Sequence, residues 1–213
     1  MSNSDKNMGT VRTKPDFPAG IRGRSKQVVP DIRVGFMLAP LFTLLPFASF
    51  IDTLRHAADE ADRSRQRFAH WSILGATEDA VVSSCGIEVC PWELFGDPKE
   101  FDYVVVVGGL VYGHEKQHLK GLEFLYRAHE QGVGLVGLCT GSFLIAEMGL
   151  LDGRRCAVHF RHQEEFKALY PKVNVVTDEL FVEDNGIFTC PGGTAAVDVA
   201  VELIAREAGP AGL

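Results

Sequence analysis

A cysteine between two glycines is the residue whose type and spacing point most directly to chemistry. The motif is Gly137-Leu138-Cys139-Thr140-Gly141, a G-x-C-x-G pattern that corresponds to the G-x-S-x-G nucleophile elbow with a thiol in place of the hydroxyl. In such an elbow a sharp turn from strand to helix pushes the central side chain out above the sheet, and backbone N–H groups converge beside it. The positive end of the following helix favours the thiolate. The motif therefore predicts a nucleophile or a ligand-binding thiol at Cys139.

A pair of glycines forms the second feature. Gly108 and Gly109 follow the four valines of residues 104–107, a run that is typical of a buried strand. Adjacent glycines at the end of an inner strand let the backbone approach a ligand closely and supply N–H donors for an oxyanion or a carboxylate. Together with the elbow, they predict backbone contacts to a bound molecule.

Aromatic residues follow several of the predicted strands and turns. Phe42 comes after the first strand, Phe143 follows the elbow, and Phe160 follows His159. If these loops meet at one end of the sheet, they line a pocket for a small organic molecule, including a quaternary ammonium bound through cation–π contact. The alternative is ordinary core packing of phenylalanine. No group of histidines, cysteines and carboxylates has the spacing of a metal site, so no metal and no cofactor are predicted.

The strands and helices that must position these residues alternate along the chain from Asp31 onward. This alternation predicts an α/β fold, a doubly wound, flavodoxin-like parallel sheet with helices on both faces, whose ligands bind beyond the carboxyl ends of the strands. Asn185-Gly186 predicts a tight hairpin turn. The expected strands lie at residues 32–38, 71–74, 86–89, 103–107, 133–138, 156–159, 173–176, 180–183 and 187–190, and the expected helices run from residue 47 and over 115–130, 140–148, 163–169 and 194–207.

Charge and composition divide the 213 residues into a polar arm and one domain. Six basic residues against two acidic ones precede Gln27, so that the first segment carries +4 and the rest of the chain −11, for a net charge of −7. We expect a disordered arm at residues 1–30, a single domain at 31–208 and a tail at 209–213. A domain this acidic is a poor binder of a phosphate backbone, so direct binding to nucleic acid is not expected.

Two features bear on the cellular compartment. Five cysteines, an odd number with no C-x-x-C pair, argue against a disulfide framework and favour a reducing cytoplasm. Residues 34–51 contain no charge and are long enough to suggest a membrane span. Pro40 and Pro46 divide this run into a strand and the start of an amphipathic helix, so no membrane segment is predicted.

Four segments together resemble one known family. They are VVVVGG at residues 104–109, GLCTGSF at 137–143, LLDGRR at 150–155 followed by His159, and PGGTAAVD at 191–198. They resemble the class I glutamine-amidotransferase-like superfamily in its DJ-1/PfpI branch, and within it the amino-terminal domain of AraC-type transcription regulators. The resemblance extends over nearly all of residues 32–208.

The resemblance implies two site residues and lacks a third. Active members use an elbow cysteine, a histidine on the strand after the elbow helix and an acidic residue; Cys139 and His159 match the first two. The turn at residues 40–46, where hydrolytic and deglycase-like members place the acid, contains no carboxylate. Without a group to orient the base or to share a proton with the thiol, the catalytic set is incomplete.

We therefore predict a non-catalytic sensing domain of a bacterial AraC-type regulator that binds a small metabolite, such as an amine or a betaine, at the Cys139 elbow. As in its relatives, we expect a homodimer that reaches DNA only through a helix-turn-helix domain outside this chain. The alternatives are a free-standing hydratase, amidase or deglycase with Cys139 as nucleophile and His159 as base, and a stress-response protein that acts through Cys139 oxidation. The predicted ligand contacts are Phe42, Gly108, Gly109, Cys139, Thr140, Phe143 and His159.

Overall fold

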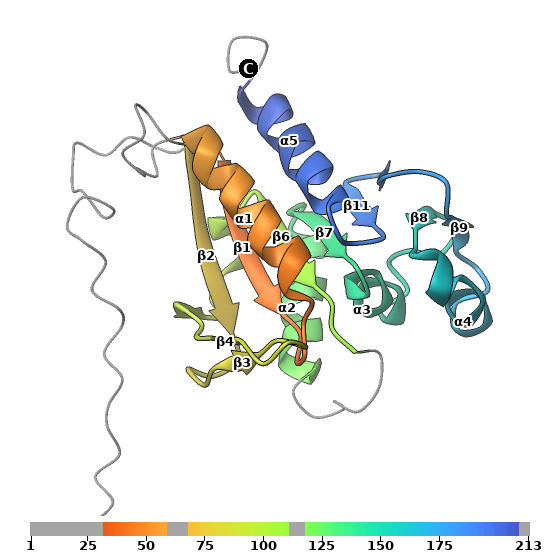
Figure 1. The fold of residues 1–213 in the computed structure, drawn as a ribbon, viewed down its shortest axis with the longest axis horizontal. Helices are drawn as coiled ribbons and strands as arrows, with labels where there is room; N and C mark the ends of the chain where they lie inside the picture. Colours follow the sequence, from red (N-terminus) through yellow and green to blue (C-terminus); the bar gives the residue numbers. More distant parts are fainter. Residues whose placement is uncertain (1–31, 59–67, 111–117, 209–213) are drawn as a thin grey trace, which may run out of the picture.

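The computed structural model describes residues 32–58, 68–110 and 118–208 (Figure 1). The strands are β1 (Ile32–Leu38), β2 (Ala69–Gly75), β3 (Val81–Val82), β4 (Glu88–Val89), β5 (Glu93–Leu94), β6 (Tyr103–Val107), β7 (Gly134–Leu138), β8 (Arg155–Ala157), β9 (Asn174–Val176), β10 (Val182–Asp184) and β11 (Ile187–Cys190). The helices are α1 (Leu44–Ala58), α2 (His118–Glu130), α3 (Gly141–Glu147), α4 (Gln163–Leu169) and α5 (Ala195–Ala208), with 3₁₀ turns η1 (Pro98–Glu100) and η2 (Phe160–His162).

Seven strands form the central sheet in the order β10-β11-β7-β6-β1-β2-β5. Every neighbouring pair is parallel except β10 and β11, which form the predicted hairpin. Asn185 and Gly186 at its turn have φ angles of 53° and 79°, the positive values that a two-residue hairpin turn requires. The predicted α/β fold with a doubly wound parallel sheet is confirmed.

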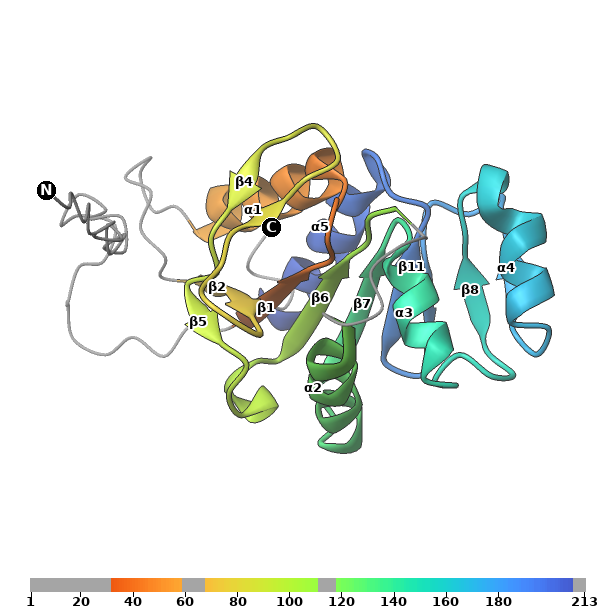
Figure 2. The same ribbon diagram turned by 90° about the horizontal axis from the view of Figure 1, so that it is seen from below.

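Helices cover both faces of this sheet. α1 and α5 lie on one face, and α2 and α3 on the other (Figure 2). The valine run of β6 is uninterrupted because both faces of this strand are buried. Val105 belongs to the core under α1 and α5, whereas Val106 belongs to the core under α2 and α3. Parallel strands covered in this way bring their carboxyl ends, and the loops that follow them, to one edge of the sheet.

Some predicted strands have a different place from the one expected. β8 and β9 pair with each other in a separate two-stranded sheet, and residues 88–89 pair with β3 in a short hairpin. β5 and η1 were not predicted, because they are only two and three residues long and β5 is exposed.

Several sequence predictions concern residues outside the described ranges. These are the arm at residues 1–30, the tail at 209–213 and the beginning of the helix expected from residue 115. The uncharged run at residues 34–51 forms β1, a turn and the first half of α1. Among the described helices, none combines the length and apolarity needed to cross a bilayer.

Candidate functional site

The predicted elbow is present between β7 and α3. Cys139 has φ of +56°, a left-handed conformation that costs a residue with a Cβ about 1 kcal/mol or more. The two motif glycines provide space. A Cβ on Gly141 would lie 2.2 Å from the carbonyl oxygen of Val106, and one on Gly137 would lie 2.9 Å from the backbone nitrogen of Ser142. The backbone strain is therefore located at the cysteine itself, and the glycines let strand and helix approach closely.

The Gly108-Gly109 pair packs directly against this elbow. A Cβ on Gly108 would lie 2.1 Å from the nitrogen of Gly141, and one on Gly109 would lie 2.2 Å from the carbonyl oxygen of Pro40. The Thr140 hydroxyl donates to the Gly109 carbonyl at 2.6 Å. The structure thus brings Gly108, Gly109, Cys139 and Thr140 together, and it uses the Thr140 side chain to fix the adjoining loop. The Gly108 N–H, predicted as a donor for a ligand, donates instead to the Leu138 carbonyl at 3.0 Å.

Thr43 is a site residue that the sequence analysis did not single out. It lies in the turn between β1 and α1, and its Oγ1 is 3.8 Å from Sγ of Cys139. Its backbone N–H donates to the Gly108 carbonyl at 3.0 Å, which fixes the turn against the elbow. Thr43 is the only residue between Pro40 and Pro46 with a polar side chain, and this could have identified it.

The loop after β11 covers another side of the thiol. Gly192 has φ of +93°, and a Cβ at this position would lie 2.8 Å from Cβ and 3.2 Å from Sγ of Cys139. The Cys139 N–H donates to the Cys190 carbonyl at 3.2 Å, which ties the elbow to the end of β11. α5 begins three residues after Gly192, so its positive end faces this part of the molecule.

His159 has a structural role in the described conformation. It lies just after β8, where its Nδ1 accepts the backbone N–H of Arg161 at 3.2 Å and caps η2. Its ring stacks on Phe160 with 4.5 Å between the ring centroids. In the described parts of the chain, no hydrogen bond joins the imidazole to the Cys139 thiol.

The predicted aromatic contacts divide between core and surface. Phe42 is fully buried and packs edge-to-face on Phe47. Phe143 is 6% exposed and packs edge-to-face on Phe166, with 4.7 Å between the centroids. Core packing, the alternative named for these residues, accounts for the positions of both. Phe160 is 67% exposed and remains available to a ligand.

The other thiols differ from Cys139 in their surroundings. Burial raises the pKa of Cys156 and of Cys190 to about 12. Cys85 is exposed, and a hydrogen bond with the Ser83 side chain lowers its pKa. Across the described ranges, no group of three or more histidines, cysteines and carboxylates could hold a metal ion.

Chemically, the arrangement presents a half-exposed thiol, a neutral hydroxyl and closely packed backbone, with no carboxylate in the turn that meets the thiol. Such a set can donate hydrogen bonds to a ligand or form a covalent bond through sulfur. Of the described residues, none is hydrogen-bonded to the thiol as a base that could accept its proton.

The sequence is similar to one family of proteins and to individual proteins with assigned roles. Residues 34–206 match the model of the DJ-1/PfpI family. The HTH-type transcriptional regulator CdhR of Pseudomonas aeruginosa is 34% identical over 180 residues, which cover 82% of this chain and 50% of that protein. An isonitrile hydratase of Pseudomonas putida is 28% identical over 173 residues, covering 81% of this chain and 70% of the hydratase.

The fold is also similar to that of a protein whose structure has been solved. The crystal structure of an AraC family transcriptional regulator from Pseudomonas putida superposes with a TM-score of 0.72 at 26% identity, covering 85% of this chain and 95% of that one. The chain spans about half the length of the curated regulators that it matches.

Proposed function

The chain belongs to the DJ-1/PfpI family, and we propose that within this family it is the small-molecule-sensing domain of an AraC-type transcription regulator. The observation that carries the proposal is the contact between the Cys139 thiol and the Thr43 hydroxyl. This neutral hydroxyl is the side-chain partner of the thiol in the described structure. The similarity to HTH-type regulators over about half of their length supports it.

The hydrogen bond of His159 argues against catalysis. A neutral imidazole has one protonated nitrogen and one with a free lone pair. Since Nδ1 accepts the Arg161 N–H, the proton lies on Nε2, and the ring has no lone pair left for the thiol proton. Among the residues that the structure describes, Cys139 therefore has neither the base nor the acid that nucleophilic turnover requires.

The proposed effector is a small amine or betaine that binds at the elbow. Phe160 offers an exposed aromatic face next to His159, and such a face attracts a quaternary ammonium group through cation–π contact. The hydroxyl of Thr43 and the thiol of Cys139 supply donors for the acceptor groups of a zwitterion.

Calorimetric titration of the purified chain with glycine betaine tests this effector class. We expect saturable binding that falls about tenfold in Phe160→Leu and also weakens in Cys139→Ser. Tyr126→Leu is the matched control, because Tyr126 is likewise exposed, at 50%, but lies on α2. Equal binding by Phe160→Leu and wild type would contradict the assignment of this site.

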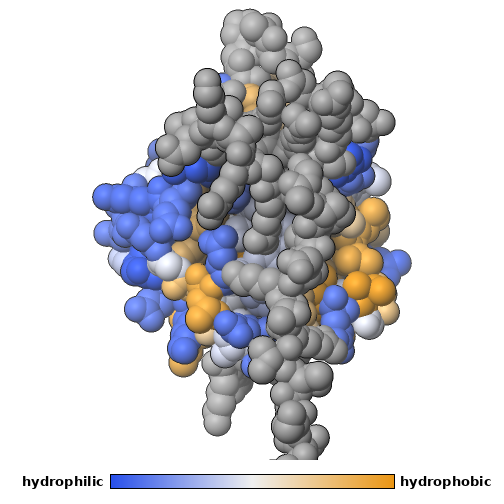
Figure 3. All heavy atoms as spheres, turned by 90° about the vertical axis from the view of Figure 1, so that its left-hand side faces the viewer, coloured by the Kyte–Doolittle hydropathy of each residue, from blue (hydrophilic) through white to orange (hydrophobic). Residues whose placement is uncertain are grey.

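We also propose that a second copy of the chain is the partner in solution. The apolar side chains of Leu45, Val82 and Ile87 are all exposed. They come from neighbouring segments of the chain, since the Leu41 N–H donates to the Val82 carbonyl at 2.8 Å. Hydrophobic patches also interrupt the hydrophilic surface on the β2 side of the molecule (Figure 3). Light scattering should give about twice 23.3 kDa, and a mass near 23.3 kDa at micromolar concentration would refute the dimer.

DNA is proposed to be bound only through a domain outside this chain. The net charge of −7 repels a phosphate backbone. In electrophoretic mobility assays, the 213-residue chain should bind promoter DNA no more tightly than random DNA. Tight, salt-resistant binding to one sequence would refute the sensor role.

An enzyme is the second candidate function, favoured by the similarity to an isonitrile hydratase over 70% of that protein and by the strained elbow at Cys139. The assay is hydration of a simple alkyl isonitrile by the wild-type chain and by Cys139→Ser. We expect both at background, because no base is bonded to the thiol within the described residues. Turnover that disappears in Cys139→Ser would establish the enzyme and exclude the sensor-only function.

A further inference from the structure

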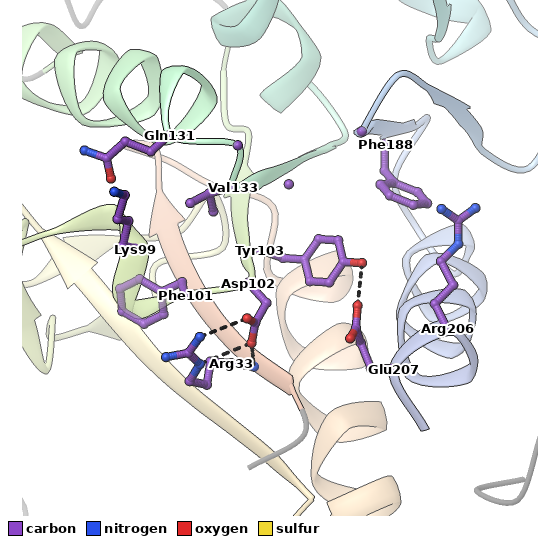
Figure 4. Close-up of a pocket in the computed structure, with 13 residues that line it drawn as sticks. Arg33, Lys99, Phe101, Asp102, Tyr103, Gln131, Val133, Phe188, Arg206 and Glu207 are labelled. Atoms are coloured by element: carbon purple, nitrogen blue, oxygen red, sulfur yellow. Dashed lines mark hydrogen bonds and ion pairs between the residues drawn. The ribbon is translucent and has the colours of Figure 1, made fainter. Parts of the chain in front are cut away.

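A hollow of about 540 Å³ lies at the amino ends of the strands, at the opposite end of the sheet from the elbow. Its lining comes from the beginnings of β1, β6, β7 and β11, the residues before β6 and before β7, and the last turn of α5 (Figure 4). This volume lies within the range of about 300–1,000 Å³ that is typical of small-molecule sites.

Aromatic and aliphatic side chains form the floor. Phe101, Tyr103, Val133 and Phe188 all line the hollow, and Tyr103 packs edge-to-face on Phe188 with 6.2 Å between the centroids. In the view of Figure 4, Val133 is drawn between Phe101 and Tyr103. Phe101, Val133 and Phe188 are buried, at 7%, 8% and 1% exposed, and Tyr103 is half-buried, so an apolar or aromatic ligand body would find only a small accessible apolar area on this floor.

Both carboxylates that line the hollow already have partners. Asp102 accepts from the Arg33 guanidinium at 2.9 and 3.2 Å and from the Arg33 backbone N–H at 2.7 Å. Glu207 accepts from the Tyr103 hydroxyl at 3.0 Å. These contacts occupy much of the acceptor capacity of the hollow.

The cationic side chains that line the hollow differ in whether they have an acidic partner. Arg206 interacts with Glu202 at 2.7 Å and with Glu183 at 3.7 Å, so its charge is neutralised. Lys99 and Gln131, by contrast, have no side-chain hydrogen bond within the described ranges, and in the view of Figure 4 both lie on the Phe101 side of the hollow. The free polar groups on this wall are therefore a cation and an amide, both of which can donate.

From this arrangement we infer that the hollow is a second binding site, distinct from the elbow, for a small carboxylate with an apolar or aromatic body. The carboxylate lies at Lys99 and Gln131, and the body lies across Phe101 toward Tyr103. A charge-assisted hydrogen bond from an ammonium is stronger than a neutral one, which selects an anion over its uncharged analogue.

The first test uses benzoate as the probe, with the ¹⁵N-labelled 213-residue chain observed by NMR. Benzoate should shift the amide resonances of residues 102–104 and 131–134 without shifting those of residues 139–143. Benzamide, its uncharged analogue, and inorganic phosphate, which has no apolar body, should each bind at least about fivefold more weakly. Benzamide binding as tightly as benzoate, or shifts confined to the elbow, would overturn the inference.

Variants provide the second test. Lys99 is exposed, so Lys99→Met should fold normally and weaken benzoate binding about 5–10-fold, with a smaller loss in Gln131→Ala. Lys120→Met is the matched control, an exposed lysine on α2 outside the hollow, and should bind like wild type. Binding should also weaken as salt increases.

Two results would refute the inference at this stage. One is unchanged benzoate affinity in Lys99→Met. The other is displacement of benzoate from these amides by a short DNA duplex, which would identify the hollow as a contact for nucleic acid phosphates. Neither result affects the elbow proposal, since its tests use Phe160 and Cys139.

Discussion

The thiols of this protein occupy environments that differ in exposure and in hydrogen bonding. Cys156 and Cys190 are buried and have pKa values raised to about 12, because burial disfavours the thiolate. Cys85 is exposed and hydrogen-bonded to Ser83, which lowers its pKa, and Cys139 is half-buried in the elbow. Reactivity toward an alkylating probe should follow these differences.

We predict that iodoacetamide at pH 8 labels Cys85 and Cys139 well before Cys156 and Cys190. The buried pair should react only after unfolding, because it is shielded and protonated. Peptide mass spectrometry over a time course measures each rate, with the urea-unfolded chain as the control in which all the thiols react. Early labelling of Cys190 in the folded chain would contradict the described burial.

Two buried serines differ in one hydrogen bond. Ser72 in β2 is 1% exposed, and its Oγ has no partner in the described structure. Ser142 in α3 is fully buried, and its Oγ donates to the Cys139 carbonyl at 3.2 Å. An unpaired buried hydroxyl opposes folding, whereas a paired one contributes to it.

Ser72→Ala should therefore raise the free energy of unfolding by about 1 kcal/mol, and Ser142→Ala should lower it by about 1 kcal/mol. Urea denaturation monitored by circular dichroism measures both. The two substitutions remove the same atom from similarly buried sites, so each controls for the other. A loss of stability in Ser72→Ala as large as that in Ser142→Ala would show that the Ser72 hydroxyl has a partner.

At the scale of elements, the elbow is held by the turn before α1, the end of β6 and the loop after β11. Gly192, in the last of these, combines a positive φ with close contact to Cys139. Gly149, after α3, also has a positive φ, of 73°, but open space surrounds it. Substitutions at the two glycines can therefore distinguish the effect of backbone strain from the effect of steric contact with Cys139.

Gly149→Ala should lower the free energy of unfolding by about 1 kcal/mol, the penalty for an alanine in the left-handed conformation. Gly192→Ala should cost at least about 2 kcal/mol, because the added Cβ also displaces Cys139. Thermal unfolding measures the stabilities, and the alkylation rate of Cys139 reports the displacement. Equal effects of the two variants on that rate would show that the loop does not position the thiol.

Much of this architecture could be predicted from local sequence. β6 and α4 have the predicted bounds, because an uninterrupted valine run and a helical repeat before Pro171 are unambiguous patterns. The contact of Thr43 with Cys139 could not be predicted, since it joins residues 96 positions apart through the topology of the sheet. Nor could sequence show that the Nδ1 of His159 is occupied by a backbone N–H two residues later.

Across the whole molecule, several groups hold their protons more tightly in the folded than in the unfolded state. Tyr103, half-buried and bonded to Glu207, has its pKa raised from 10 to about 12, chiefly by burial. Cys156 and Cys190 are raised from 9 to about 12. For such groups, the stabilisation is fully present below the unfolded pKa and declines as pH rises toward the folded value.

The free energy of unfolding should therefore decline between pH 9 and pH 12 as these groups titrate. Tyr103→Phe should make the decline shallower above pH 10, since the phenol is gone while the ring remains. Denaturant titrations at a series of pH values measure both slopes. A stability that does not change between pH 9 and pH 11 would contradict the burial of all three groups.

The position of β1 has a consequence for the order in which the chain is synthesised. Val34 pairs with Trp71 on one side and with Tyr103 on the other. Because translation proceeds from the amino terminus, the first of the described strands to be made is a central one, and its second neighbour leaves the ribosome about 70 residues later. Until then, one edge of β1 and the uncharged stretch around it remain open to other nascent chains. Slow translation while β6 is still inside the ribosome would therefore prolong the exposure of this edge.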